Sequence, residues 1–175
     1  MICPARVRAL ALVAPLGLWR DDAPTADTLI LPPADLAQVL WADPAGEPAR
    51  RWSALPEDHE ANVAAQIDGI QRRAAAARLL WPLPDKGLRK RLHRLRAPTL
   101  LLWGDADRAN PPAYVESWRG LVPGACVVML RGGHMLTWEA PEALADTITD
   151  FLATADRPGP PEGPGSFLAA DHTRR

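Results

Sequence analysis

The stretch "LLLWGDADRANPP", residues 100–112, decides the fold class of this chain. Its apolar beginning is typical of a strand that is buried on both faces of a parallel sheet, and Gly104 ends the apolar run. Two aspartates, Asp105 and Asp107, follow directly in a loop that closes with two prolines. The stretch therefore predicts a buried strand whose carboxyl end leads into a loop bearing carboxylates.

Two other stretches repeat this apolar pattern and define the class of fold. They are "VRALALVA" at residues 7–14 and "ACVVML" at residues 125–130. Helical patterns at residues 111–122 and 141–155 alternate with the apolar runs. In the second helix one apolar stripe contains Leu144, Ile148, Phe151 and Leu152. This alternation predicts an α/β protein with about three parallel strands and flanking helices.

The region between residues 20 and 85 shows helices without a strand signal. Residues 32–41 predict a short helix and residues 57–81 a longer one, in which Val63, Ile67, Ile70 and Ala74 follow the helical period. A helical insertion between two parallel strands is expected to form a lid above the carboxyl edge of the sheet, where ligands bind in open α/β folds.

The expected organisation has four parts. They are a first core strand at 1–19, a helical lid at 20–85, the remaining core at 86–155, and a Pro/Gly-rich disordered tail at 156–175.

The segment "KGLRKRLHRLR", residues 86–96, is strongly basic. Leu88, Leu92 and Leu95 recur at helical spacing, which predicts an amphipathic helix with a solvated charged face. No stacking aromatic residues are interleaved with the charges, so the segment does not indicate nucleic-acid binding.

Composition restricts the partners and the compartment. The chain has 20 Lys+Arg and 21 Asp+Glu, so its overall charge predicts neither a nucleic-acid nor a membrane partner. Its two cysteines form no CxxC pair or Cys/His cluster, which fits a reducing, cytoplasmic compartment and indicates no metal site. No phosphate-binding glycine loop is present, so no cofactor is expected. The apolar run near the N-terminus is interrupted by Pro15 and Gly17, unlike a secretory signal.

A histidine completes the candidate site. His134 follows the third predicted strand, and Gly132 and Gly133 permit the sharp turn that aims it inward. Loops after neighbouring parallel strands meet at the same sheet edge, so Asp107 and His134 are expected side by side. A carboxylate there accepts the imidazole Nδ1 proton and leaves Nε2 free to act as a general base.

These motifs together carry a family resemblance. The segments "RVRALALVAPLGL", "APTLLLWGDADRANPP" and "GGHMLTWEAPEALADTITDFL" resemble the later strands of the α/β-hydrolase fold, in its lid-bearing serine-hydrolase branch. The resemblance covers about residues 4–153 and implies that Asp107 is the triad acid and His134 the triad histidine. It also implies that Asp105 shapes the turn and that Glu139 lies at the positive end of the final helix. Ala109 and Asn110 depart from the apolar pair usual in the family, a change expected to loosen the acid loop.

The nucleophile of that family has no counterpart in this sequence. The family serine lies in G-x-S-x-G before the acid and the histidine, and the chain has no such motif. Its three serines, Ser53, Ser117 and Ser166, do not follow a buried strand. The sequence thus resembles the C-terminal portion of a hydrolase, truncated at its N-terminus, and this chain alone is expected to be inactive because nucleophile and oxyanion hole are missing.

Three functions remain open. The first is hydrolysis of an ester-like or carbon–carbon bond in a small, apolar-leaning substrate through a Ser-Asp-His triad. The second is a non-catalytic binding module that uses an exposed sheet edge to bind a partner or a second copy of the chain. The third is a fragment of a dehalogenase or epoxide hydrolase, which has an aspartate nucleophile. Trp41, Trp52 and Trp81 are expected to be lid core rather than substrate-lining residues.

Overall fold

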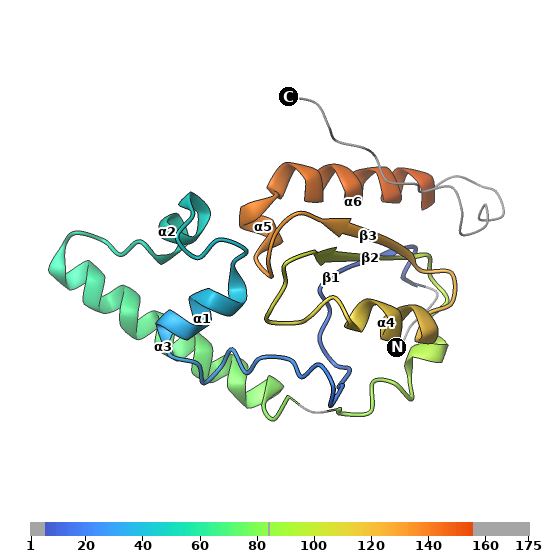
Figure 1. Cartoon of the computed structure of the whole chain (residues 1–175), viewed down its shortest axis with the longest axis horizontal. Helices are drawn as coiled ribbons and strands as arrows, with labels where there is room; N and C mark the ends of the chain where they lie inside the picture. The colour runs from blue at the N-terminus through green and yellow to red at the C-terminus, as the bar shows by residue number, and fades with distance from the viewer. Residues whose placement is uncertain (1–5, 84, 156–175) are drawn as a thin grey trace.

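A three-stranded parallel sheet forms the centre of the molecule. The computed structural model describes residues 6–83 and 85–155. The strands β1 (Leu10–Val13), β2 (Thr99–Gly104) and β3 (Cys126–Leu130) lie side by side in that order (Figure 1). Both neighbouring pairs are parallel. The predicted α/β class is therefore confirmed, although β1 is shorter than the apolar run at 7–14.

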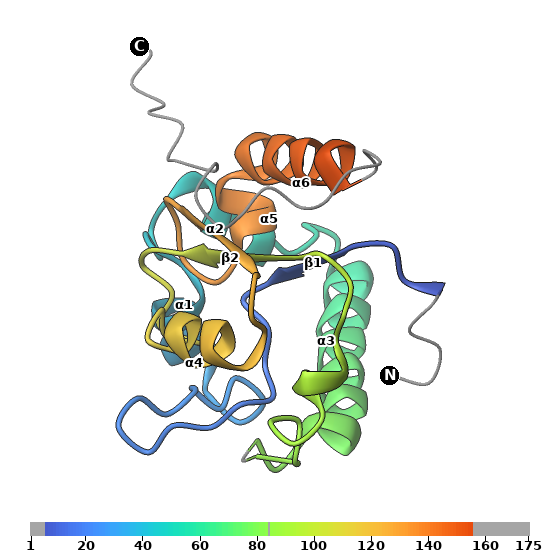
Figure 2. The same cartoon turned by 90° about the vertical axis from the view of Figure 1, so that its right-hand side faces the viewer.

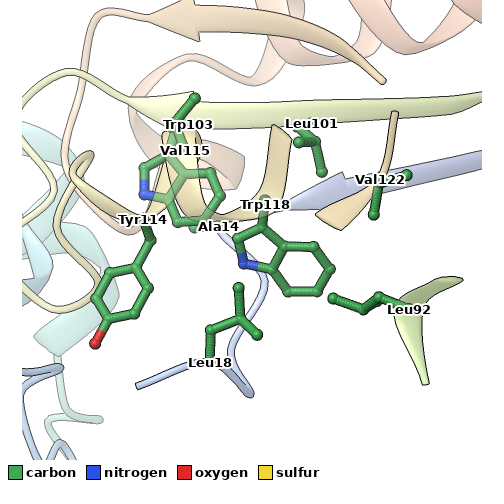
Figure 3. Packing of buried hydrophobic residues seen from close by; sticks show 9 residues of the cluster. All are labelled: Ala14, Leu18, Leu92, Leu101, Trp103, Tyr114, Val115, Trp118 and Val122. Carbon is green, nitrogen blue, oxygen red and sulfur yellow. The ribbon is translucent and has the colours of Figure 1, made fainter. Parts of the chain in front are cut away.

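Helices cover both faces of the sheet. Helix α4 (Tyr114–Leu121) lies against one face and α6 (Pro141–Ala155) against the other (Figure 1). Leu101 and Trp103 of β2 pack in the cluster on the α4 side (Figure 3). Leu100 and Leu102 pack in the cluster on the α6 side. Because alternate strand residues point to opposite faces, this double cover explains why β2 is continuously apolar.

The final helix follows its sequence pattern closely. Helix α6 has the predicted bounds, and its stripe residues Leu144 and Phe151 are buried. Leu152 is an exception, since 42% of its surface is exposed. A short helix, α5 (Leu136–Glu139), lies between the histidine loop and α6.

The region from 20 to 85 is helical, as expected. It contains α1 (Pro33–Leu40), α2 (Glu47–Ser53) and α3 (His59–Leu80), of which α2 was not predicted. Leu36 and Leu40 of α1 pack with Trp41, Ala49 and Ala109 in a third cluster. Since Ala109 belongs to the acid loop, this cluster joins α1 to the carboxyl edge of the sheet.

The apolar stripe predicted on α3 is not a buried face. Helix α3 has no buried residue, and Val63, Ile67 and Ile70 are 42%, 50% and 69% exposed. In Figure 2 the helix runs along one side of the molecule, with its length directed away from α6. The apolar period correctly predicts a helix here. Asp58 caps its N-terminus by accepting a hydrogen bond from the Ala61 amide. Burial also needs an opposing surface, and the described residues do not provide one.

The helix predicted at residues 86–96 is wrong. Gly87 has φ +80°, and only a 3-10 turn, Leu92–Arg94, forms within the segment. Its backbone bonds span three residues, as from the Leu95 amide to the Leu92 carbonyl at 2.9 Å. Leu92 is nevertheless buried, and Leu88 packs beside it against the α4-side cluster. The apolar spacing thus identified the inward side chains but not the backbone that carries them.

Two expectations concern the ends of the chain and its relation to membranes. The tail expected at 156–175 lies outside the described residues. Within residues 6–83 and 85–155, the helices are too short or too polar to cross a lipid bilayer.

Candidate active site

The acid loop and the histidine loop meet at the carboxyl edge of the sheet. The Asp105 amide donates to the Leu130 carbonyl at 2.9 Å, and the Ala106 amide donates to the Gly132 carbonyl at 2.9 Å. A Cβ atom on Gly104 would lie 2.2 Å from the Gly133 carbonyl oxygen. Only glycine at the end of β2 therefore lets the two loops approach this closely.

Asp107 is buried and fully bonded. Its side chain has no exposed surface. Oδ1 accepts hydrogen bonds from the amides of Ala109, at 2.9 Å, and Asn110, at 2.8 Å. Oδ2 lies 2.8 Å from Nδ1 of His134. The two backbone bonds fix the carboxylate plane, so that the second oxygen is directed at the imidazole.

His134 presents its ring to solvent on one side. Its side chain is 24% exposed, while Asp107 beneath it is covered. Because Asp107 occupies Nδ1, the second ring nitrogen, Nε2, is the one available for proton transfer. Within the described residues Nε2 has no hydrogen-bond partner. The structure therefore brings together the two residues that the sequence predicted to act as a pair.

The chain after α1 holds the backbone of the histidine loop. The carbonyl of Leu40 accepts hydrogen bonds from the His134 amide, at 2.8 Å, and from the Met135 amide, at 3.2 Å. A Cβ atom on Gly133 would lie 2.6 Å from the Ala42 nitrogen and 2.7 Å from the Leu40 carbonyl oxygen. Gly132 has φ +147°, a value that a side chain disfavours. Both glycines predicted to allow the turn are thus needed, for different reasons.

Glu139 and Asp105 join the same loops with their side chains. Oε2 of Glu139 accepts from the Gly133 amide at 2.7 Å, and Oε1 accepts from the Ala42 amide at 2.8 Å. The sequence placed Glu139 at the start of the last helix, but its carboxylate bonds to the histidine loop and to the chain after α1. Asp105 accepts from the Gly132 amide at 3.0 Å, so it shapes the junction of the two loops as well as its own turn.

Arg108 is a positioning residue that the sequence did not reveal. Its guanidinium donates to the carbonyl oxygens of Gln38 and Ala42. These acceptors lie at and just beyond the end of α1, which has no basic residue in its last turn. An arginine from elsewhere thus takes the place of a C-terminal cation. Its position directly after Asp107 was the only sequence signal. That position does not indicate a role unless the end of α1 is known to lie beside the acid loop.

Asn110 anchors the acid loop, contrary to the expectation that it would loosen it. Asn110 and Ala109 are each 1% exposed. The Asn110 amide side chain donates to the carbonyls of Ala14 and Pro15, both at 3.1 Å, just beyond β1. Its own carbonyl accepts from Nε1 of Trp103 at 2.7 Å. The polar side chain thereby ties the loop of β2 to the end of β1.

The described serines lie away from this pair. Ser53 bonds to the carbonyls of Ala49 and Arg50 within α2, and Ser117 accepts from Arg20 beside α4. Ser166 falls outside the described residues. In residues 6–83 and 85–155, therefore, no serine hydroxyl contacts His134.

An open hollow of about 590 Å³ lies near the two loops but does not include the pair. The acid and histidine loops, the end of α5, the chain after α1 and the beginning of α2 line it, with Asp105, Gly132, Glu139, Trp41 and Glu47 among the lining residues.

The three tryptophans between residues 20 and 85 differ in burial. Trp41 is 1% exposed and meets the edge of Trp52, whereas Trp52 and Trp81 are 43% and 56% exposed. The prediction that all three belong to the core is therefore right for Trp41 and wrong for Trp52 and Trp81, for which the described residues provide no covering surface. Cys126 packs in the cluster on the α6 side, and burial raises the pKa of its thiol.

Comparisons with known proteins agree on the fold. Residues 38–141 match the family described as alpha/beta hydrolase fold. The match covers more than half of the chain, and the chain belongs to the α/β-hydrolase fold family.

Among curated proteins, the chain is similar to Lipase 3 of Moraxella sp. (strain TA144). The two are 29% identical over 91 residues, which is 50% of this chain and 28% of the lipase. It is 32% identical to monoacylglycerol lipase abhd6-B of Xenopus laevis over 82 residues, or 44% of this chain and 24% of that one. The chain thus spans about a quarter of the length of these relatives.

Solved structures share the same architecture. A membrane phospholipase A described as a bacterial virulence factor superposes with a TM-score of 0.61 at 23% identity, over 87% of this chain and 51% of that one. An esterase from Exiguobacterium antarcticum superposes with a TM-score of 0.56 at 22% identity, over 84% and 57% of the respective chains. At this identity the likeness concerns the fold.

Proposed function

We propose that Asp107 and His134 are the acid and the base of a Ser-Asp-His triad in a lipase- or esterase-like hydrolase. The observation that carries the proposal is the 2.8 Å contact between Asp107 Oδ2 and His134 Nδ1, made by a carboxylate whose other oxygen is fixed by two amides. The lipase relatives support the class of reaction. The serine and the oxyanion hole are contributed by residues other than those described.

The proposed mechanism assigns one proton path. Nδ1–H of His134 stays bonded to Asp107, which remains ionised and stabilises the imidazolium. Nε2 takes the hydroxyl proton as the serine oxygen attacks the substrate carbonyl, and the tetrahedral intermediate expels the leaving group with that proton. Water then hydrolyses the acyl-enzyme by the same path in reverse. The substrate class is a small, apolar-leaning molecule with an ester-like or carbon–carbon bond, acted on in the cytoplasm.

The first test measures the tautomer of His134 directly. Long-range ¹H–¹⁵N NMR of the chain should show His134 with its proton on Nδ1 at a pH where the ring is neutral. Asp107→Asn should move the proton to Nε2, because an amide NH₂ facing Nδ1 needs an acceptor there. Asp105→Asn is the matched control and should leave the tautomer unchanged, since Asp105 bonds to Gly132 and not to the ring. A proton on Nε2 in the unaltered chain would refute the assignment.

The second test concerns the nucleophile. The genomic DNA preceding the codon for Met1 is translated in frame. A G-x-S-x-G motif there, with esterase activity of the extended chain that is lost in His134→Ala, supports the triad. An aspartate at the centre of that motif instead indicates the dehalogenase or epoxide hydrolase class. On p-nitrophenyl esters the 175-residue chain alone should show no turnover above that of its own His134→Ala variant.

A second candidate function, a binding module, is favoured by the free edge of the sheet. Strand β1 pairs with β2 on one side, and within the described residues no strand pairs with its other side. Val13 and Leu16 next to this edge are 36% and 41% exposed. An unpaired parallel edge with exposed apolar side chains favours strand addition. An in-frame stop codon directly upstream, together with concentration-dependent dimerisation in sedimentation experiments, would favour this function over the hydrolase.

A further inference from the structure

The positive charge of the chain is concentrated in one exposed segment. Residues 86–96 contain six Lys and Arg residues and no Asp or Glu, although the whole chain has a net charge of −1. The six cations are all exposed, and they are Lys86, Arg89, Lys90, Arg91, Arg94 and Arg96. The expectation that the chain has no membrane partner came from its net charge. The structure shows that this charge is unevenly distributed.

The backbone of the segment separates its apolar from its charged side chains. Leu92 belongs to the buried cluster around Trp118 (Figure 3). Leu88 and Leu95 pack against the same cluster. With the leucines directed into the core, the cations between them are left on the outer side. The packing of the three leucines, rather than a helix, therefore keeps these cations on the outer side.

Exposed apolar side chains lie next to this array. Leu79, Leu80 and Trp81, at the end of α3, are 80%, 45% and 56% exposed. Nζ of Lys86 donates to the carbonyls of Leu79, at 3.1 Å, and Leu80, at 2.8 Å. The end of α3 and the segment lie together in the lower part of both views (Figures 1 and 2). Residues 79–81 therefore adjoin the beginning of the segment 86–96 at Lys86, and the two stretches together are called the basic–apolar surface.

Two carboxylates beside this surface offset only part of its charge. Asp85 accepts from the Gly87 amide, and Asp27 accepts from Nε1 of Trp81. Within residues 6–83 and 85–155, the six cations take part in no ion pair, whereas Arg51, Arg72 and Arg119 do. Positive charge on the basic–apolar surface is therefore available to an anionic partner.

We propose that the basic–apolar surface docks the protein on an anionic lipid bilayer. The cations match lipid phosphate and carboxylate groups, and exposed leucine and tryptophan side chains suit the interface between headgroups and acyl chains. A phosphate-binding surface for nucleic acid has no use for aliphatic side chains as exposed as Leu79. The binding is peripheral and does not depend on the hydrolase activity.

The experiment measures binding of the full chain to vesicles by flotation. The probes are phosphatidylcholine vesicles and mixed phosphatidylcholine–phosphatidylserine vesicles. Binding to the mixed vesicles should be much stronger and should weaken as salt is added. Replacing Arg89, Lys90 and Arg94 by Gln should lower the partition coefficient about a hundredfold, from roughly fivefold per basic residue. Leu79→Ser with Leu80→Ser should lower it about tenfold.

The matched control removes the same charge elsewhere. Replacing Arg51, Arg72 and Arg119 by Gln should change the partition coefficient less than about threefold, because these cations are paired with acidic side chains and lie outside residues 79–81 and 86–96. Equal losses in both triple variants, or equal binding to the two kinds of vesicle, would overturn the proposal. So would tight binding of a DNA or RNA duplex that is lost in the Arg89, Lys90 and Arg94 variant while vesicle binding is retained.

Discussion

Gly133→Ala tests whether close backbone packing positions His134. The new methyl group would lie 2.6 Å from the Ala42 nitrogen and 2.7 Å from the Leu40 carbonyl oxygen. To reach the 3.4 Å of ordinary contact, the histidine loop and the chain after α1 must separate by about 0.8 Å. Both neighbours are backbone atoms, so no side-chain rotation relieves the clash.

The expected cost follows from what that separation disturbs. Overpacking of a close contact costs about 1–3 kcal/mol. The movement also stretches the bond from the His134 amide to Leu40 and the bond from the Gly133 amide to the Glu139 carboxylate. Each is worth on the order of 1 kcal/mol or more. We expect a loss of about 3 kcal/mol in the free energy of unfolding, a large share of the roughly 5–15 kcal/mol typical of a domain.

Gly120→Ala is the matched control, because a methyl group there meets no atom within 4 Å. Gly120 lies in α4, so this change should stabilise the chain by about 0.5–1 kcal/mol. Urea unfolding followed by tryptophan fluorescence measures both variants, and NMR of the His134 ring reports its bond to Asp107. A loss below about 0.5 kcal/mol in Gly133→Ala with an unchanged ring signal would refute the positioning argument.

Three other predictions concern the core, the acid loop and the thiol. Leu101→Ala should lower the free energy of unfolding by about 2–5 kcal/mol and Leu152→Ala by less than about 1 kcal/mol, because Leu101 is 0% and Leu152 is 42% exposed. Similar urea midpoints for the two variants would contradict this difference in burial. Asn110→Ala should cost about 1–3 kcal/mol, because the Ala14 and Pro15 carbonyls each lose a donor; an unchanged midpoint would show that this anchor is unimportant. In a Cys3→Ser background, Cys126 should react with a disulfide reagent more slowly in the folded chain than in urea. The pH midpoint of the reaction should lie above the ordinary thiol value, because burial raises the pKa of Cys126. Equal rates in the folded and the unfolded chain would contradict this.

The sequence predicted best where local pattern and burial agree. Helix α6 has the expected bounds, and strand β2 differs from the predicted strand by only about a residue, because each is packed against elements that its apolar period already implies. The pairing of Asp107 with His134 was predictable for a related reason, since loops after neighbouring parallel strands must meet. Arg108 could not be found in this way. Its partners are backbone carbonyls at the end of α1, and backbone acceptors leave no trace in residue identity.

The failures have a common physical origin. Apolar spacing records which side chains avoid water, but not whether a surface is present to receive them. At residues 86–96 the leucines pack into the core, although the segment, with Gly87 at positive φ and a run of cations, does not form an α-helix. On α3 the reverse holds, since the helix formed and Ile67 and Ile70 remain exposed.

The hydrogen bonds at the end of α1 limit which helices could move if the site opens. The Leu40 carbonyl accepts from the histidine loop, the Ala42 amide donates to Glu139 of α5, and the Ala42 carbonyl accepts from Arg108 of the acid loop. A swing of α1 as a rigid arm would pull on the backbone of His134 and misalign its ring. Helix α2 is held to the same place, because Ala49 packs in the cluster of Leu36, Leu40 and Ala109. If the helices above the site open, we therefore expect α1 and α2 to stay with the sheet and α3, which has no buried residue, to be the part that moves.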